Sequence, residues 1–172
     1  PSYPSGRVFD GWRGRWFQRD EWRGFSVLRA FIYPTKSPRT LPRLANYFSF
    51  VFSSLLAGVF MARPCDVILV ESPPLFLGLS GWVLRHLKRA RLVLNVSDLW
   101  PETAVALGLY ERESRAVRVA VALERWLYRM ADAVTGQSSG IVRGVLEKHA
   151  GARAFLVSGG VDCTLFSPQK RD

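Results

Sequence analysis

Blocks of apolar residues alternate along the chain between short continuous runs and longer periodic segments. Short runs bounded by Pro, Gly or charged residues predict strands, and apolar residues spaced three to four apart predict helices. We therefore expect strands at residues 25–33, 66–72, 91–98, 132–138 and 154–160. We expect helices at residues 44–62, 75–90, 101–107, 113–131 and 139–149. This alternation of helices and buried strands predicts an α/β fold, with a parallel sheet covered by helices on both faces.

The longest uncharged segment, residues 44–62, carries its large apolar side chains on one helical face. Those side chains are Leu44, Tyr47, Phe48, Val51, Phe52, Leu55, Leu56, Val59 and Phe60. The opposite face holds mostly Ala, Ser and Gly, and the run is just long enough to span a bilayer. A lipid-exposed helix need not be one-sided, so the periodicity favours a core helix lying on a sheet over a membrane-spanning helix.

The N-terminal segment is basic and rich in tryptophan. Residues 1–12 contain several Pro and Gly and predict a loop, and the first 23 residues show no clean period. Residues 1–43 hold nine basic and three acidic side chains together with Trp12, Trp16 and Trp22. This mixture is typical of a segment at an anionic membrane surface. It is equally typical of a solvated, poorly packed Arg-rich segment, and both interpretations stay open here.

Composition and charge narrow the class of protein. The chain has 172 residues, of which 48% are apolar and 22% charged, which suits one globular domain and excludes a disordered chain. Its two cysteines exclude a disulfide scaffold and suit a reducing cytoplasm. The net charge of +10 indicates an anionic partner. Nucleic acid is not expected, because the basic residues are dispersed and no recognition motif is present.

Candidate chemistry gathers where the predicted strands end. Ligands of open parallel sheets bind beyond the carboxyl ends of the strands. Those ends carry Glu71 to Pro73, Ser97 to Trp100, Gln137-Ser138 and Ser158 to Gly160. We expect no cofactor and no metal, because the chain has no GxGxxG or P-loop motif and no metal-ligand spacing.

The motif NVSDLWPE, residues 95–102, has two interpretations. Asp98 and Glu102 flank Trp100, and an aromatic ring beside carboxylates is a common way to hold a sugar. Alternatively Asp98 caps the following turn and Trp100 packs in the core.

Four segments occur in an order and at a spacing typical of one family. They are DVILVESPPLFLGLSGW (66–82), RLVLNVSDLWPETAVALG (91–108), LERWLYRMADAVTGQSSGI (123–141) and VSGGVDCTLFSP (157–168). With these, roughly residues 1–168 resemble the N-terminal, acceptor-side half of family-four retaining glycosyltransferases of the GT-B fold. The resemblance is to the WbuB-like group, which builds O-antigen, capsule and exopolysaccharide.

The resemblance implies a fragment of a two-domain enzyme. Residues 1–158 would be an incomplete N-terminal Rossmann-like domain that lacks its first strand, and residues 159–172 would begin the linker to an absent donor-binding domain. The whole enzyme would transfer a sugar from a nucleotide-sugar donor to a lipid-linked saccharide acceptor. It would lie at the cytoplasmic, inner face of the bacterial plasma membrane, on an anionic surface. The donor would bind mainly to the absent domain, so this chain alone would be inactive.

The resemblance also implies which residues contact substrate. The substrate-binding candidates are Glu71, Ser72, Pro73, Asp98, Trp100, Glu102 and Ser138. Asp98 or Glu102 would orient the acceptor hydroxyl. Two positions depart from the family pattern: Ser97 stands where many members have His, and Gly159 stands where Asn is usual. The alternative function is a non-catalytic, membrane-associated subunit or remnant that needs a separate donor-binding chain.

Overall fold

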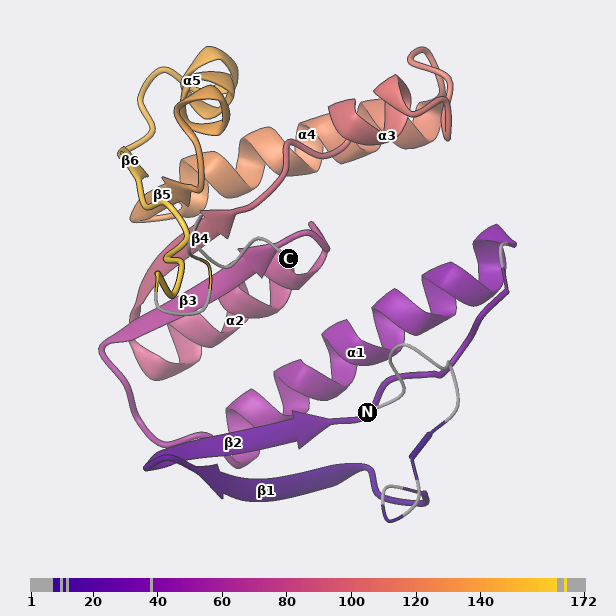
Figure 1. Cartoon of the computed structure of the whole chain (residues 1–172), viewed down its shortest axis with the longest axis vertical. Coiled ribbons are helices and arrows are strands. Elements are labelled where there is room, and N and C mark those ends of the chain that lie inside the picture. The colour runs from indigo at the N-terminus through magenta and orange to yellow at the C-terminus, as the bar shows by residue number, and fades with distance from the viewer. Residues whose placement is uncertain (1–7, 10, 12, 38, 164–165, 167–172) are drawn as a thin grey trace.

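The computed structural model describes residues 8–9, 11, 13–37, 39–163 and 166 (Figure 1). The loop expected at residues 1–12 lies mostly outside the described residues, as does most of the linker expected at residues 159–172. In chain order the elements are β1 (Phe17–Trp22), β2 (Phe25–Ala30), α1 (Thr40–Phe60), β3 (Val67–Ser72), α2 (Leu77–Lys88), β4 (Arg91–Val96), α3 (Glu102–Ala106), α4 (Arg115–Met130), β5 (Ala133–Gly136), α5 (Ser139–Lys148) and β6 (Ala154–Leu156).

Four parallel strands, in the order β3-β4-β5-β6, form the main sheet. The predicted α/β class with a Rossmann-like parallel sheet is confirmed. The core lies on one face, where strand side chains meet the loop before α2 and helices α4 and α5. Its buried members are Val70, Leu75, Leu92, Leu94, Val96, Ala120, Leu127, Tyr128, Val134 and Val145.

The strand order explains why these helices share a face. Each successive strand is added on the same side of the previous one. Parallel crossovers are right-handed, so the connecting helices all fall on the same side of the sheet. The second helical layer expected from the sequence is therefore not formed by the described residues. On that opposite face Leu69 is 65% exposed and Val67 is also exposed. The prediction that residues 66–72 form a strand is confirmed, but β3 is an edge strand buried on one face only.

Strands β1 and β2 form a separate antiparallel hairpin, in which Phe17 pairs with Ala30 and Trp22 with Phe25. The turn consists of Arg23 and Gly24, both with positive φ, and such a two-residue turn matches the twist of paired strands. The strand at residues 17–22 is missing from the sequence prediction. The reason is that its sequence, FQRDEW, places four consecutive polar residues between two aromatic ones and does not alternate apolar with polar positions.

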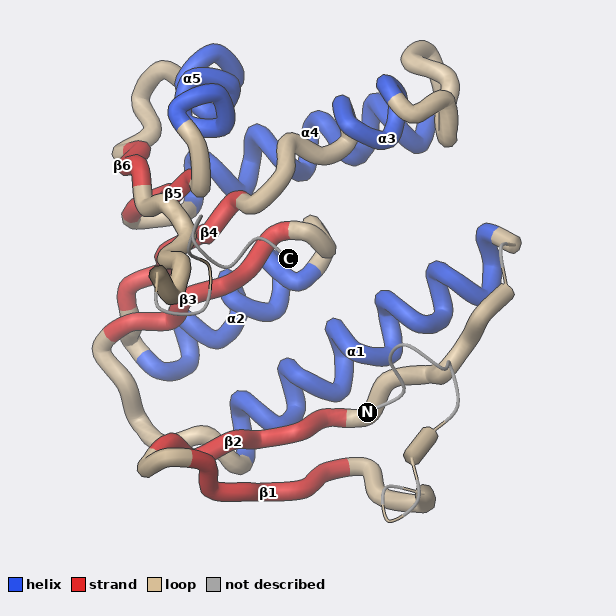
Figure 2. The backbone as a smooth tube through the Cα atoms, in the orientation of Figure 1, coloured by secondary structure: helices blue, strands red, loops and turns tan. Residues whose placement is uncertain are grey.

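Helix α1 lies between the hairpin and α2, as Figure 2 shows. Its small residues make these contacts: Ser53 and Ala57 are buried, and Gly58 lies against Leu84. The Oγ of Ser53 donates to the carbonyl of Phe31, and the Oγ of Ser80 in α2 donates to the carbonyl of Val51 at 2.9 Å.

The predicted helix is thus confirmed, and it lies on the two-stranded sheet of the hairpin and on α2. It is not a core helix, because Ser53 and Ala57 are its only buried residues among those described. Of the large apolar side chains, Phe48, Phe52 and Phe60 are exposed and the others are partly buried. The closest contacts fall to Ser, Ala and Gly because small side chains let neighbouring elements approach closely. Among the described helices, α1 alone is long and apolar enough to cross a membrane by length and composition, and 11% of that stretch is buried.

Candidate functional site

The carboxyl ends of the strands meet along one edge of the sheet. Ser72, Val96, Gly136 and Leu156 stand in register at this edge. The loops that follow β3 and β4 therefore lie side by side, as the alternation of strands and helices predicts. Ser72 itself is buried, and its carbonyl accepts from the backbone N–H of Ser97 at 2.9 Å. Through this hydrogen bond, Ser72 connects the ends of β3 and β4, from which the two loops begin.

A network of polar side chains crosses three strands at this edge. The carboxylate of Glu71 accepts from Nδ2 of Asn95 at 2.5 Å and from Oγ of Ser97. The Oγ of Ser97 in turn accepts from Nε2 of Gln137 at 2.9 Å, and the Oδ1 of Asn95 accepts from Oγ1 of Thr135 at 2.7 Å. In every one of these bonds an N–H or O–H group donates to an oxygen. The network therefore holds Glu71 in a defined orientation on the open face of the sheet.

Asn95 and Thr135 are not among the residues that the sequence suggested for the site. They lie within strands that are otherwise apolar, and each is a polar residue in register with the other. That exception to the apolar pattern is the signal that could have identified them. Ser97 takes part in the same network and bonds to both Glu71 and Gln137.

Asp98 anchors the turn between β4 and α3. The Oγ1 of Thr103 donates to Oδ1 of Asp98 at 2.6 Å and contacts the carbonyl of Leu99 at 3.0 Å. Asp98 is half-buried, which leaves part of its carboxylate accessible. The structure therefore supports a role for Asp98 in the turn. A carboxylate held by one hydroxyl is also free to accept from a second one, so this role is compatible with substrate binding.

Glu102 belongs to an ion-pair network with α4 and α5. Its Oε2 lies 2.6 Å from Nζ of Lys148, and the same ammonium lies 2.6 Å from Oε2 of Glu124. The hydroxyl of Tyr128 donates to Oε1 of Glu124 at 2.6 Å. Burial raises the pKa of Glu124, while the bonds from Lys148 and Tyr128 act in the opposite direction. Burial and the neighbouring Glu124 raise the pKa of Tyr128. Glu102 is therefore engaged in an ion pair with Lys148, which joins α3 to α5.

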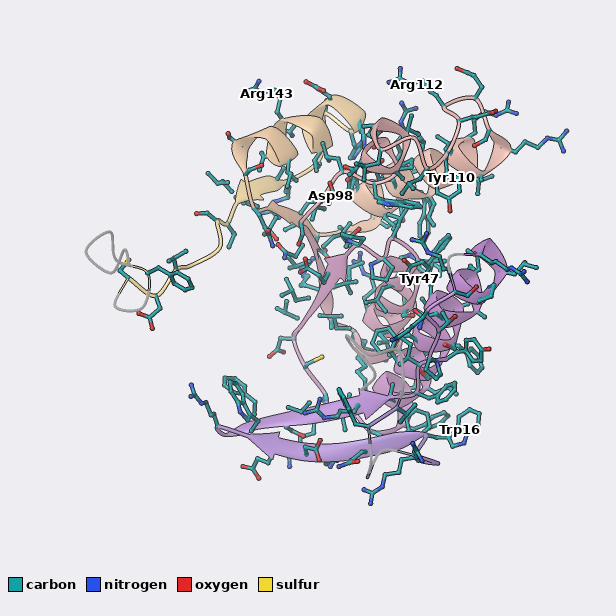
Figure 3. The ribbon with its side chains drawn as sticks, turned by 45° about the vertical axis from the view of Figure 1, so that its right-hand side comes forward. Trp16, Tyr47, Asp98, Tyr110, Arg112 and Arg143 are labelled. Atoms are coloured by element: carbon teal, nitrogen blue, oxygen red, sulfur yellow. The ribbon has the colours of Figure 1, made fainter. Side chains whose placement is uncertain are left out.

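A cleft of about 310 Å³ opens beside this edge, between the start of α1 and the loops after β3 and α3. Its lining is aromatic and apolar, with one cation: Arg43, Leu44, Tyr47, Pro73, Pro74, Leu75, Phe76, Trp100, Leu109 and Tyr110. The rings of Trp100 and Tyr110 meet edge to face, with centroids 6.2 Å apart. Figure 3 shows Tyr47 on α1 and Tyr110 on the segment after α3, with Asp98 at the end of β4.

The structure brings together some of the sequence-predicted residues and separates others. Pro73 and Trp100 line the cleft, and Glu71 lies in the polar network on the sheet. Ser138 caps α5, where its Oγ accepts from the N–H of Ile141 at 3.3 Å, and it does not line the cleft. Tyr47 and Tyr110 are site residues that sequence reasoning missed, because α1 and the α3–α4 segment approach β3 and β4 only in the folded chain.

Comparison with known proteins identifies the family. The chain is 29% identical over 159 residues to a protein of Escherichia coli (strain K12) described as "Putative colanic acid biosynthesis glycosyl transferase WcaI". The matched region is 91% of this chain and 39% of that protein, so the chain spans well under half of its relative. The family model of the glycosyl transferase 4-like domain matches residues 7–160. The parallel sheet with its site at the strand ends thus belongs to a member of the glycosyl transferase 4-like family.

Proposed function

We propose that this chain is the acceptor-binding part of a glycosyltransferase that acts in cell-surface polysaccharide biosynthesis. The enzyme would move a hexose or N-acetylated sugar from a nucleotide-sugar donor to a saccharide on a lipid diphosphate, with retention of configuration. The observation that carries this proposal is the cleft beside the strand ends that is lined by Tyr47, Trp100, Tyr110 and one arginine, Arg43. In this proposal the nucleotide-sugar is held mainly by residues outside the chain.

The chemistry of the cleft suits such an acceptor. Aromatic rings offer flat apolar surfaces for the C–H faces of a sugar, and proline rings extend that surface. A guanidinium forms strong charge-assisted hydrogen bonds with phosphate oxygens, so Arg43 would contact the diphosphate of the carrier. A lining that is mostly apolar with one cation therefore matches a ligand that combines a sugar, a diphosphate and a prenyl chain.

Asp98 is the residue we propose for orienting the acceptor. It lies two residues before Trp100, which lines the cleft, and its carboxylate already accepts one hydroxyl from Thr103. Accepting a hydrogen bond from the sugar hydroxyl would hold that oxygen toward the donor, and such positioning contributes much of the rate of a transfer reaction. Glu102 is the weaker candidate, because Lys148 already engages its carboxylate.

The test is transfer by the full-length protein that contains these residues. Radiolabelled nucleotide-sugars would be offered with a polyprenyl-diphosphate-linked saccharide, and labelled lipid would be extracted and counted. We expect Tyr110→Ala to raise the acceptor KM at least ~10-fold, equivalent to about 1.4 kcal/mol, with donor KM within about twofold. Tyr33→Ala, at an exposed tyrosine outside the cleft, is the matched control. Equal effects of the two substitutions, or no labelled lipid with any donor, would overturn the proposal.

A further inference from the structure

Helix α1 presents an apolar surface to the outside of the molecule. Leu41 is 78% exposed, Phe52 63% and Phe60 79%, and Phe48 is also exposed. Leu41, Phe48 and Phe52 follow helical spacing along one side, and no charged residue occurs from residue 44 to residue 62. A surface helix of a globular protein normally turns charged residues outward. An exposed apolar stripe of this length marks an interaction surface.

The opposite side of α1 packs against the rest of the protein. This attachment determines how the apolar surface can be oriented relative to a partner. That side is held by side-chain hydrogen bonds to Phe31, directly after β2, and to α2, and by close contact between Gly58 and Leu84. Its partners include the end of α2, which carries His86 and Lys88. A helix surrounded by lipid on all sides could not keep these polar neighbours. The geometry therefore suits a helix lying in the plane of a membrane surface, about 31 Å long at 1.5 Å per residue.

Basic residues surround the apolar stripe. Arg39 and Arg43 stand at the start of α1, and Arg63 follows its end. From residue 13 to residue 63 the chain has nine Lys or Arg and two acidic residues, and one of these two, Asp20, is paired with Arg29 at 2.7 Å. Cations beside an apolar face are the pattern of a helix that binds anionic lipid.

An exposed tryptophan and an apolar cleft lie on the side of α1 that faces the hairpin. Trp16 stacks on Phe31 with ring centroids 4.9 Å apart, and Figure 3 shows it beside α1. A cleft of about 450 Å³ opens next to it, lined mainly by apolar residues that include Phe31 and Phe50, with Arg15 and Arg29 also in its wall. Tryptophan is enriched at the headgroup level of membranes, where its ring is apolar and its N–H is polar.

We infer that Leu41, Phe48, Phe52 and Phe60 form a docking surface for the anionic leaflet of a lipid bilayer. In this arrangement α1 lies in the plane at the boundary between headgroups and acyl chains, and the arginines at both helix ends contact lipid phosphates. Charge complementarity selects this occupant over a second copy of the chain, because a second copy would bring the same arginines against one another. The inference goes beyond the proposed transfer reaction and is measured without donor or acceptor.

The first test is binding of the full-length protein to vesicles. We expect co-sedimentation with phosphatidylcholine vesicles that contain about 30% phosphatidylglycerol, and little with pure phosphatidylcholine. Raising the salt from about 0.1 M to about 0.5 M should weaken the binding, because counterions screen the arginines. Equal binding to both kinds of vesicle, or none to either, would overturn the inference.

Substitutions then locate the surface. Phe52→Asp should lower the partition coefficient at least ~10-fold, whereas Val119→Asp, at a 66% exposed apolar residue of α4, should change it by less than about twofold. Arg39→Glu should weaken vesicle binding more than Arg143→Glu, at an exposed arginine of α5. Glutamate at position 39 should not disrupt α1, because a negative charge at the start of a helix is favourable.

Two results would contradict this assignment of residues. Phe52→Asp and Val119→Asp could lower vesicle binding equally, which would place the contact elsewhere. Alternatively, sedimentation velocity could show a dimer that Phe52→Asp dissociates, in a protein that binds no vesicles. That outcome would make a second copy of the chain the occupant. Circular dichroism of each variant would show that the fold is retained.

Discussion

The ammonium of Lys148 lies 2.6 Å from the carboxylate of Glu124, which is 1% exposed. Lys148 comes from α5 and Glu124 from α4, so this ion pair joins the two helices that follow β4 and β5. The hydroxyl of Tyr128 completes the shell around the carboxylate. Because a buried charge is stable only when it is paired and hydrogen-bonded, the two residues depend on each other.

We predict that Lys148→Met destabilises the fold by about 3–5 kcal/mol at neutral pH, because it leaves a buried carboxylate without its cation. Urea unfolding would measure the change. Burial raises the pKa of Glu124 in the folded state, so its contribution to stability is fully present at low pH and is lost as the pH rises through that pKa. Removing Lys148 raises this pKa further, and the destabilisation should shrink as the pH falls.

The control for this prediction is Glu102→Gln, which removes the second and more exposed carboxylate that contacts Lys148. Exposed pairs contribute about 1 kcal/mol or less, so the loss should be small. A loss as large as that of Lys148→Met would show that the network depends on Glu102 instead.

Replacing glycine by alanine should have opposite effects on stability at Gly81 and Gly140. Gly81 lies where α2 packs closely on the sheet, whereas Gly140 in α5 has more space around it. A Cβ at Gly81 would overlap Cγ2 of Val70, a β-branched side chain in β3, and would lie 3.0 Å from Leu92. We expect Gly81→Ala to destabilise by about 1–3 kcal/mol. At Gly140 in α5 the nearest such atom lies at 3.7 Å, so Gly140→Ala should stabilise by up to about 1 kcal/mol. Thermal unfolding of both variants checks the sign, and a stabilising Gly81→Ala would refute the contact.

Asp98 offers a test of the proposed chemistry in the full-length enzyme. In Asp98→Asn the amide oxygen can still accept from Thr103, so the turn should persist while the negative charge is lost. We expect kcat/KM with the lipid-linked acceptor to fall at least ~10-fold, or about 1.4 kcal/mol. Asp66→Asn is the control, because this exposed aspartate precedes β3 at the end opposite to the strand ends of the site. It should leave the rate unchanged. Unchanged transfer in Asp98→Asn would remove Asp98 from the site.

The lowered pKa of Asp132 predicts that the stability of the fold depends on pH in the acidic range. Burial alone would raise its pKa, but bonds from the N–H of Leu92 at 2.8 Å and from Arg91 at 3.0 Å, with the charge of Arg85, lower it overall. A lowered folded-state pKa contributes stability above the unfolded value of about 3.9 and loses it as the pH falls through the folded pKa. Stability should therefore fall less steeply below about pH 4 in Asp132→Asn than in wild type. Urea titrations between about pH 2 and 6 would show this, and parallel curves would contradict it.

The strands and helices of the α/β unit were predictable because apolar periodicity is local. Residues 66–72, 91–98 and 113–131 contain β3, β4 and α4 with ends shifted by a few residues. The hairpin strand β1 was not predictable, because its four consecutive polar residues, QRDE, give no alternation of apolar and polar positions. Of the candidate site, Pro73 and Trp100 lie in the cleft, but Tyr47 and Tyr110 come from segments whose approach no local pattern records.

By itself, the sequence determined the order of strands and helices from β2 onward, the parallel sheet, and the edge at which polar residues gather, since each follows from neighbouring residues. Only the tertiary structure decided which face of α1 is buried, because neither face carries a charge and the choice depends on how closely α2 and β2 approach. It also joined Glu71 to Asn95 and Ser97 across β3 and β4, since side chains far apart in the chain meet only through the register of paired strands.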